Sequence, residues 1–196
     1  MLQVWKMPIY NGKLLHIHIP KTGGTTITEC LKDKKVQVGY YDKASKEEYG
    51  NVPPQHMTMK YTSKFFDLDK IKSFAVIRDP WHRTVSEYVW AKRTNRWEGL
   101  NIWLEYVLTN MDHTKHNNHF VQQYRFVNQK VRLFNYNDWD KICDYISRNL
   151  KFPFHTKGRK QQRFEYVPPS IDILDPQVKM LWENVYERDV ELFNTL

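Results

Sequence analysis

The chain has 196 residues, of which 41% are apolar and 15% aromatic, and its 30 basic and 22 acidic residues give a formal charge of +8. This length predicts one domain over residues 1–196 with a substantial core, and the aromatic content excludes intrinsic disorder. No stretch of about eighteen apolar residues occurs, so no membrane-spanning helix is predicted.

The net charge limits the classes of partner, and the two cysteines indicate the cellular compartment. Two cysteines are too few for a disulfide scaffold, and they predict buried, reduced thiols in a cytoplasmic protein. A charge of +8 is compatible with nucleic acid, with an anionic surface or with a polyanionic small ligand. Composition does not choose among these three classes of partner.

The first predicted elements are a strand, a glycine-containing turn and a helix. Lys13–Ile19 alternates apolar side chains with two histidines, which is the period of a strand. Pro20–Gly24 is predicted as a turn, and Thr25–Lys34 as a helix that begins on threonine hydroxyls. Further along, Pro53 and Pro54 predict extended backbone.

A second strand and two helices follow. Lys72–Ile77 is a short apolar run typical of a buried strand. Asp79 is a good N-cap and Pro80 suits the first helical position, so a helix is predicted from Pro80 to about Arg96. Helical spacing of apolar residues predicts another helix over Trp97–Met111.

The second half repeats this alternation. A strand is predicted at Lys130–Tyr136, then a helix capped by Asp138, a basic irregular segment over Lys151–Ser170 and a last helix opened by Asp175 and Pro176. Strands that alternate with helices indicate an α/β layered domain with a largely parallel sheet.

The turn after the first strand has the composition of an anion site. Gly23 and Gly24 let backbone N–H groups approach an anion at the positive end of the new helix. Lys21 adds a mobile positive charge, and Thr25 and Thr26 add hydroxyl donors. The alternative is a tight turn that needs its glycines only for geometry.

This turn is not a Walker A loop. That motif places its lysine after the second glycine, whereas Lys21 precedes both glycines. A nucleoside triphosphatase also needs a metal-binding aspartate on a neighbouring strand, and Asp79 is assigned to the helix cap. The sequence therefore favours a nucleotide that binds without magnesium.

A second chemical signal follows the second strand. Arg78 stands at the strand's carboxyl end, where ligands bind in open α/β sheets. Ser86 lies two turns into the next helix, on the same face as Arg83. A guanidinium and a hydroxyl held on rigid elements can bind one phosphate. For Arg83 an ion pair with Glu87 and a phosphate contact both stay open.

The segments HIPKTGGTT and VIRDPWHRTVSEY together closely resemble the two cofactor motifs of sulfotransferases that use 3′-phosphoadenosine 5′-phosphosulfate, above all the carbohydrate enzymes of the heparan 2-O, heparan 6-O and chondroitin types. The resemblance implies a three-layer, P-loop-like α/β domain with a central, mostly parallel sheet flanked by helices. It implies binding without a metal to the 5′ side by Pro20, Lys21, Thr22, Gly23, Gly24, Thr25 and Thr26, and to the 3′-phosphate by Arg78 and Ser86. Weaker resemblance continues in HFVQQ (119–123), in VRLFNYNDWDKICDYI and in YERDVELF near the end of the chain.

The resemblance also implies a mechanism. Sulfuryl transfer is an in-line displacement helped by positioning and charge, with Lys21 at the leaving phosphate. His56 is the candidate base, because it stands between the two motifs much as the heparan enzymes place their catalytic histidine. The alternative for His56 is a surface loop residue, which would leave His16, His18 or Glu87 as base.

Three further expectations concern the late basic segment, a metal site and the acceptor. Lys157 and Arg159 in the late basic segment are candidates to fold over the nucleotide. A metal site built on His16 and His18, or on His113, His116 and His119, is disfavoured because no carboxylate or cysteine completes a ligand set. The acceptor is predicted to be a hydroxyl-bearing small molecule or a glycan.

The acceptor pocket is expected in the loops at 36–62 and 93–123. Trp90, Trp97 and Trp103 can stack on a sugar ring, although helix-spaced tryptophans more often pack in a core. The two other classes of function are a nucleotide-dependent phosphotransferase and a basic nucleic-acid-binding module. We expect neither a nucleic-acid partner nor a membrane partner.

Overall fold

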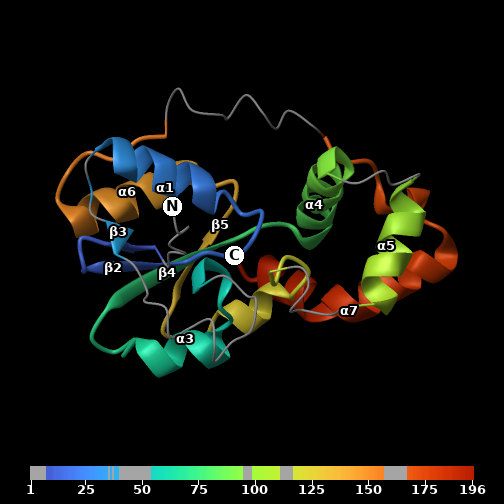
Figure 1. The fold of residues 1–196 in the computed structure, drawn as a ribbon, viewed down its shortest axis with the longest axis horizontal. Coiled ribbons are helices and arrows are strands. Elements are labelled where there is room, and N and C mark those ends of the chain that lie inside the picture. Colours follow the sequence, from blue (N-terminus) through green and yellow to red (C-terminus); the bar gives the residue numbers. More distant parts are fainter. Residues whose placement is uncertain are drawn as a thin grey trace.

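A computed structural model describes residues 8–34, 36, 38–39, 54–94, 99–110, 117–156 and 167–196 (Figure 1). Its sheet has five strands in the order β3-β1-β2-β4-β5. The strands are β1 (Ile9–Tyr10), β2 (Leu14–Ile17), β3 (Val38–Gly39), β4 (Lys72–Ile77) and β5 (Arg132–Asn135).

Four of the five strands run in the same direction. β2 pairs in parallel with β4, and β4 pairs in parallel with β5, while β1 is antiparallel to both β2 and β3. The reversal at β1 comes from the short turn before β2, where Asn11 and Gly12 have φ of 50° and 65°. The prediction of a mostly parallel sheet is confirmed, and the two-residue strands β1 and β3 were too short to show a sequence period.

Helices cover both faces of this sheet (Figure 1). The helices are α1 (Gly24–Asp33), α3 (Met59–Phe65), α4 (Pro80–Thr94), α5 (Leu100–Thr109), α6 (Trp139–Leu150) and α7 (Pro176–Asn194), with short 3₁₀ turns η1 (Pro54–His56), η2 (Gln123–Phe126) and η4 (Ile171–Ile173). Side chains of α1 and α6 pack on one face, and those of α3, η2 and the end of α7 on the other. The predicted three-layer α/β architecture is therefore confirmed.

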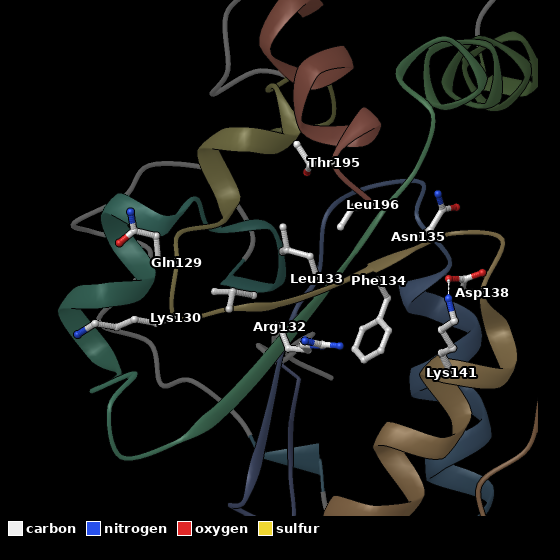
Figure 2. A pocket seen from close by; sticks show the side chains of 11 residues that line it. Gln129, Lys130, Arg132, Leu133, Phe134, Asn135, Asp138, Lys141, Thr195 and Leu196 are labelled. Carbon is white, nitrogen blue, oxygen red and sulfur yellow. Dashed lines mark hydrogen bonds and ion pairs between the residues drawn. The ribbon is translucent and has the colours of Figure 1, made fainter.

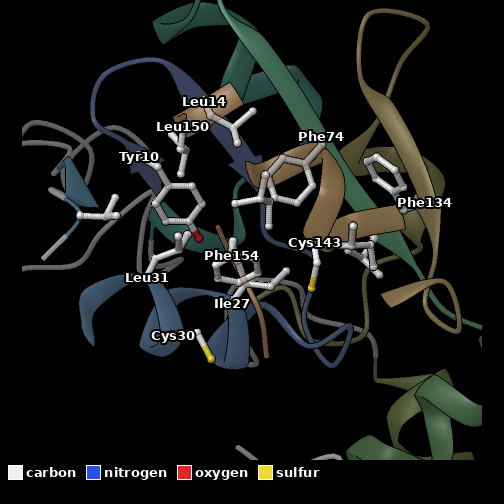
Figure 3. Packing of buried hydrophobic residues seen from close by; sticks show 14 residues of the cluster. Tyr10, Leu14, Ile27, Cys30, Leu31, Phe74, Phe134, Cys143, Leu150 and Phe154 are labelled. Carbon is white, nitrogen blue, oxygen red and sulfur yellow. The ribbon is translucent and has the colours of Figure 1, made fainter. Parts of the chain in front are cut away.

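The core on the α1 and α6 side is built from both aromatic and aliphatic side chains (Figure 3). Phe74 of β4 is fully buried, and the ring of Phe134 of β5 meets its ring edge-on. Cys30 and Cys143 are both buried in this cluster, as the sequence predicted. Burial of one such aromatic side chain contributes about 1.5–3 kcal/mol, so this layer holds α1 firmly against β2 and β4.

A third cluster joins α4, α5 and α7 beside the sheet (Figure 1). Trp103 of α5 is 1% exposed, which shows that its role is core packing. The Trp182 Nε1–H of α7 donates to the Thr84 hydroxyl of α4 at 2.9 Å. This cluster fixes the direction of α4, the helix that follows the second motif.

The predicted elements agree with the observed ones to within a few residues at their ends. β4 spans the predicted residues, and the Asp79 carboxylate caps α4 by accepting from the His82 N–H at 2.8 Å. Pro54 begins a 3₁₀ turn instead of extended backbone, because its fixed φ also suits a first helical position. α4 ends at Thr94, and α5 begins at Leu100. Within the described ranges, no helix is both long enough and apolar enough to cross a bilayer.

Candidate functional site

The loop between β2 and α1 is an open helix N-terminus. Gly23 is the N-cap with φ of 87°, and it makes no side-chain cap hydrogen bond. The helix begins at Gly24, one residue before the predicted start at Thr25, and its cap is Gly23 instead of a threonine. The Thr22 hydroxyl of the turn donates back to the Ile19 carbonyl at 2.9 Å. Because the first N–H groups of a helix lack partners inside it, the amides of residues 24–26 and the helix dipole favour an anion here.

Both glycines of this loop are needed by their neighbours. A Cβ on Gly24 would lie 2.1 Å from the Cδ2 atom of His18, and one on Gly23 would lie 2.8 Å from the Trp139 ring. Gly23 also has a positive φ, which L side chains rarely adopt. The loop is therefore packed against a histidine below and a tryptophan of α6 beside it.

Replacement of Gly24 by alanine is expected to destabilise the fold. The His18 ring is buried and has little room to move away from the new methyl group. The free energy of unfolding should therefore fall by about 1–3 kcal/mol, which a lower melting temperature would show. Gly99→Ala is the matched control, because no described residue lies within 4 Å of its Cβ position. Equal melting temperatures for the two variants would contradict this packing.

Two arginines brace the loop through its carbonyl groups. Arg78 donates from Nη1 to the Lys21 carbonyl at 3.1 Å, and Arg83 donates from Nε to the Pro20 carbonyl at 3.0 Å. Arg83 also donates from Nη2 to the carbonyls of His119 and Val121, at 2.7 and 3.0 Å. Arg83 is thus a buried brace, a role that neither sequence interpretation anticipated, and the loop amides are left to face the site.

Arg78 itself is held by residues from the three segments of weaker resemblance. The Gln123 amide accepts from the Arg78 N–H at 3.0 Å and donates to the Arg78 carbonyl at 2.8 Å. Asp189 of α7 in turn accepts from the N–H groups of Gln123 and Tyr124, at 2.7 and 2.9 Å. The Arg78 guanidinium lies over the Tyr136 ring, 4.5 Å from its centroid. These contacts fix Arg78 at the carboxyl end of β4.

Ser86 adds a buried hydroxyl with no hydrogen-bond partner among the described residues. Spacing along α4 places it on one face with Arg83, Glu87 and Trp90. A buried hydroxyl without a partner costs free energy, so such a group usually serves a ligand or a water molecule. This atom fits the oxygen-rich ligand that the second motif predicts.

Lys21 combines an unusual backbone with a partly buried charge. Its φ of 66° is rare for a residue with a Cβ. Burial lowers the pKa of Lys21, and the Glu87 carboxylate acts against that shift. Its Nζ atom lies 5.7 Å from the centroid of the Trp90 ring. The ammonium therefore stands beside the open end of α1 with Glu87 and Trp90 of α4 as neighbours.

His56 is buried, so it is not a surface loop residue. Its Nδ1 atom lies 3.0 Å from the Asn117 carbonyl, and the Asn118 amide donates to the His56 carbonyl at 2.8 Å. A carbonyl only accepts, so Nδ1 carries the proton and Nε2 is left as the acceptor. Burial lowers the pKa of His56 well below its usual value.

Four histidine rings form a row that ends at a carboxylate. His16 stacks near His18 at 5.6 Å, His18 meets His56 at 5.0 Å, and His56 meets His119 at 4.9 Å between centroids. The His119 Nδ1 atom lies 2.9 Å from Oε2 of Glu87, which is 3% exposed. Sequence spacing alone did not identify this pair, although the helical period already placed Glu87 on the face of α4 that carries Ser86.

Burial governs the titration of the inner histidines. It lowers the pKa of His18 to about 4 and that of His16 well below its usual value. The His16 Nδ1 atom lies 3.2 Å from the Tyr10 hydroxyl, which places this ring in the core beside α1. Among the described residues, no three His, Cys, Asp or Glu side chains are arranged to hold a metal ion.

Some predicted residues cannot be compared with the structure. Lys157, Arg159, His113, His116 and Trp97 lie outside the described residues. Of the other two tryptophans considered for an acceptor, Trp103 is buried, whereas Trp90 is 47% exposed beside Lys21. The structure thus brings Lys21 and Arg78 together by direct contact, joins Pro20 to Arg83, and places Ser86, Glu87 and Trp90 on the adjoining helix face.

A separate open cavity of about 500 Å³ follows the outer edge of β5 (Figure 2). Its lining includes Lys141, which pairs with Asp138 at 2.6 Å, and Lys130, which pairs with Asp69 outside the cavity. None of the predicted catalytic or nucleotide-binding residues lines it. Charged side chains of this kind commonly protect an edge strand from pairing with another chain, so the cavity is not the candidate site.

The family comparison agrees with this geometry. The model of a family described as "Sulfotransferase family" matches residues 10–194, which include both motifs and the helix that carries Asp189. Searches of curated proteins and of solved structures find no significant match.

Proposed function

The chain belongs to the sulfotransferase family, and on this premise we propose that it transfers the sulfuryl group of 3′-phosphoadenosine 5′-phosphosulfate to a hydroxyl of a carbohydrate or a related small molecule. The observation that carries the proposal is the meeting of the two motifs, in which Arg78 donates to the Lys21 carbonyl beside the open N-terminus of α1.

The proposed donor site follows from the charges and free donors of these residues. The amides of residues 24–26, with the hydroxyls of Thr25 and Thr26, would hold the 5′-phosphosulfate at the positive end of α1. Arg78 and the partnerless Ser86 hydroxyl would hold the 3′-phosphate, which ATP lacks. Positive side chains supply the neutralisation that magnesium supplies in other nucleotide enzymes, so no metal is required.

The proposed chemistry is an in-line displacement. The acceptor oxygen bonds to sulfur as the bond from sulfur to the 5′-phosphate oxygen breaks, and the electron pair leaves with that phosphate, where Lys21 neutralises it. A histidine takes the proton of the acceptor hydroxyl. His56 is the residue that the sequence names for this role, and its Nε2 atom is in the form that accepts a proton.

The acceptor side is marked by one exposed aromatic ring. Trp90 is 47% exposed, and it lies beside both Lys21 and His119. The flat face of an indole is suited to the apolar C–H face of a sugar ring. We therefore propose a carbohydrate hydroxyl as the acceptor, with Trp90 as the surface on which the ring stacks.

Replacement of Arg78 tests the donor site without knowledge of the acceptor. Calorimetry with 3′,5′-diphosphoadenosine in EDTA should show micromolar or tighter binding to the wild-type chain. Arg78→Ala should weaken it by about 2–4 kcal/mol, because a charged partner of a phosphate is lost. Arg148→Ala is the control, because that arginine is exposed on α6 and donates to a carbonyl of its own helix. No binding by the wild type in EDTA would overturn the proposed function.

A second experiment addresses the acceptor. ³⁵S-labelled donor is incubated with desulfated heparan sulfate, chondroitin, 4-nitrophenyl glycosides and free 4-nitrophenol, and transfer is measured for the wild type and for Trp90→Ala. Transfer to a sugar that falls in Trp90→Ala at unchanged nucleotide affinity supports the carbohydrate assignment. Transfer to free 4-nitrophenol and to none of the sugars would assign a different acceptor class.

A further inference from the structure

His119 and Glu87 form a carboxylate–imidazole pair at the acceptor side of the site. The Glu87 carboxylate is 3% exposed and lies 2.9 Å from the His119 Nδ1 atom. An ionised carboxylate only accepts, so Nδ1 carries the proton and the Nε2 atom of His119 is left with a lone pair. The same arrangement orients the imidazole base in hydrolases of unrelated folds.

A positive charge is better supported on His119 than on His56. An imidazolium at His119 would face the Glu87 carboxylate at 2.9 Å. An imidazolium at His56 would have a backbone carbonyl as its hydrogen-bond partner, and its neighbours are the Arg83 guanidinium and the imidazole rings of His18 and His119. Because a base must hold the proton that it receives, these surroundings favour His119.

Position favours His119 as well. Its side chain is 17% exposed, whereas His56 is buried behind it. The His119 ring lies 5.4 Å from the Trp90 ring, and Lys21 Nζ lies 5.7 Å from the same ring. The imidazole and the ammonium are thus both next to Trp90, at the place where a bound acceptor would meet the sulfuryl group.

We propose that His119, held by Glu87, is the catalytic base of the transfer, and that His56 packs behind it as a positioning residue. This inference rests on the proposed sulfuryl transfer. The acceptor O–H proton goes to Nε2 of His119 as the new O–S bond forms and the bond to the 5′-phosphate breaks. The resulting imidazolium is neutralised by Glu87 and returns its proton to water after the product leaves.

Asparagine variants separate the two histidines, because an asparagine amide keeps a donor near the Nδ1 position and lacks Nε2. His119→Asn should lower transfer of the ³⁵S label to the acceptor panel by about 100-fold, and Glu87→Gln by about 10-fold or more, with unchanged affinity for 3′,5′-diphosphoadenosine. His56→Asn should keep a transfer rate at least about 10-fold higher than that of His119→Asn. His82→Asn, on an exposed part of α4, is the control and should match the wild type.

Chemical labelling supplies a readout that does not depend on turnover. Diethyl pyrocarbonate reacts with neutral imidazole nitrogens, and peptide mass spectrometry should find His119 labelled well before His56. Labelling of His56 first, or a His119→Asn variant within about 3-fold of the wild-type rate, would overturn the assignment. A wild type that binds no nucleotide and transfers no label would refute the proposed function, and the labelling order would still decide whether His119 is the reactive imidazole.

Discussion

Lys21→Ala is expected to lower the rate of sulfuryl transfer by about 1000-fold while the fold is retained. The ammonium stands at the open N-terminus of α1, where the proposed reaction would develop negative charge on the leaving phosphate. Removal of one such donor typically costs two to three orders of magnitude, because the charge appears only in the transition state. Transfer of ³⁵S label at saturating donor measures this loss directly.

The variant should keep its stability, because alanine has the same Cβ as lysine and removes a partly buried charge. Burial already lowers the pKa of Lys21, so the folded state holds this charge at a cost. Lys13→Ala is the matched control, because that lysine is exposed before β2. A Lys21→Ala enzyme with near-normal turnover would reduce Lys21 to a turn residue and remove the proposed leaving-group contact.

Acidification is expected to destabilise the protein steeply below about pH 6.5. Burial lowers the pKa values of His16, His18 and His56 in the folded state, so these rings stay neutral while the unfolded chain takes up protons. Their contribution is therefore present above about pH 6.5 and is lost as the pH falls towards about 4. For each pH unit that the pH falls within this window, each histidine lowers the free energy of unfolding by about 1.4 kcal/mol. The three together therefore lower it by roughly 4 kcal/mol per pH unit.

Urea unfolding followed by tryptophan fluorescence between pH 7.5 and 5 measures this slope. Asp189 makes the opposite contribution: burial raises its pKa, so its protonation at lower pH favours the folded state. It is one group against three histidines. His155→Asn should leave the slope unchanged, because His155 is exposed. A slope that corresponds to one histidine or fewer would show that the row takes up protons while still folded.

Local sequence was sufficient for the elements that build the nucleotide side. The strand at 72–77, the Asp79 cap and the glycine loop each depend on neighbours within a few residues, so patterns of period and capping identified them. The same rules placed the start of α1 on the threonine hydroxyls at Thr25, whereas the helix begins at Gly24 with Gly23 as its cap, and the Thr22 hydroxyl makes a contact back to the Ile19 carbonyl. Such a contact depends on the turn's own geometry, which residue type does not specify.

The residues that hold the site in place could not be identified from local sequence patterns. Gln123 holds the backbone of Arg78 from 45 positions away, and Asp189 holds Gln123 from 66 positions away. Their segments were noticed through the family resemblance, but nothing in a single sequence shows which polar atom meets which. The role of Arg83 illustrates this, because its side chain reaches carbonyls of three separate positions instead of Glu87 or a phosphate.

By itself, the sequence determined a layered α/β chain with a glycine-containing loop before its first helix and a basic second motif, because strand period, glycine freedom and capping act over a few residues. Tertiary structure alone decided that Glu87 meets His119 across 32 positions and that four histidine rings lie in one row. A helical period shows which face a side chain occupies, but packing decides which distant residue lies opposite it. The candidate base therefore emerged only from the fold, whereas the candidate nucleotide site could already be read in the chain.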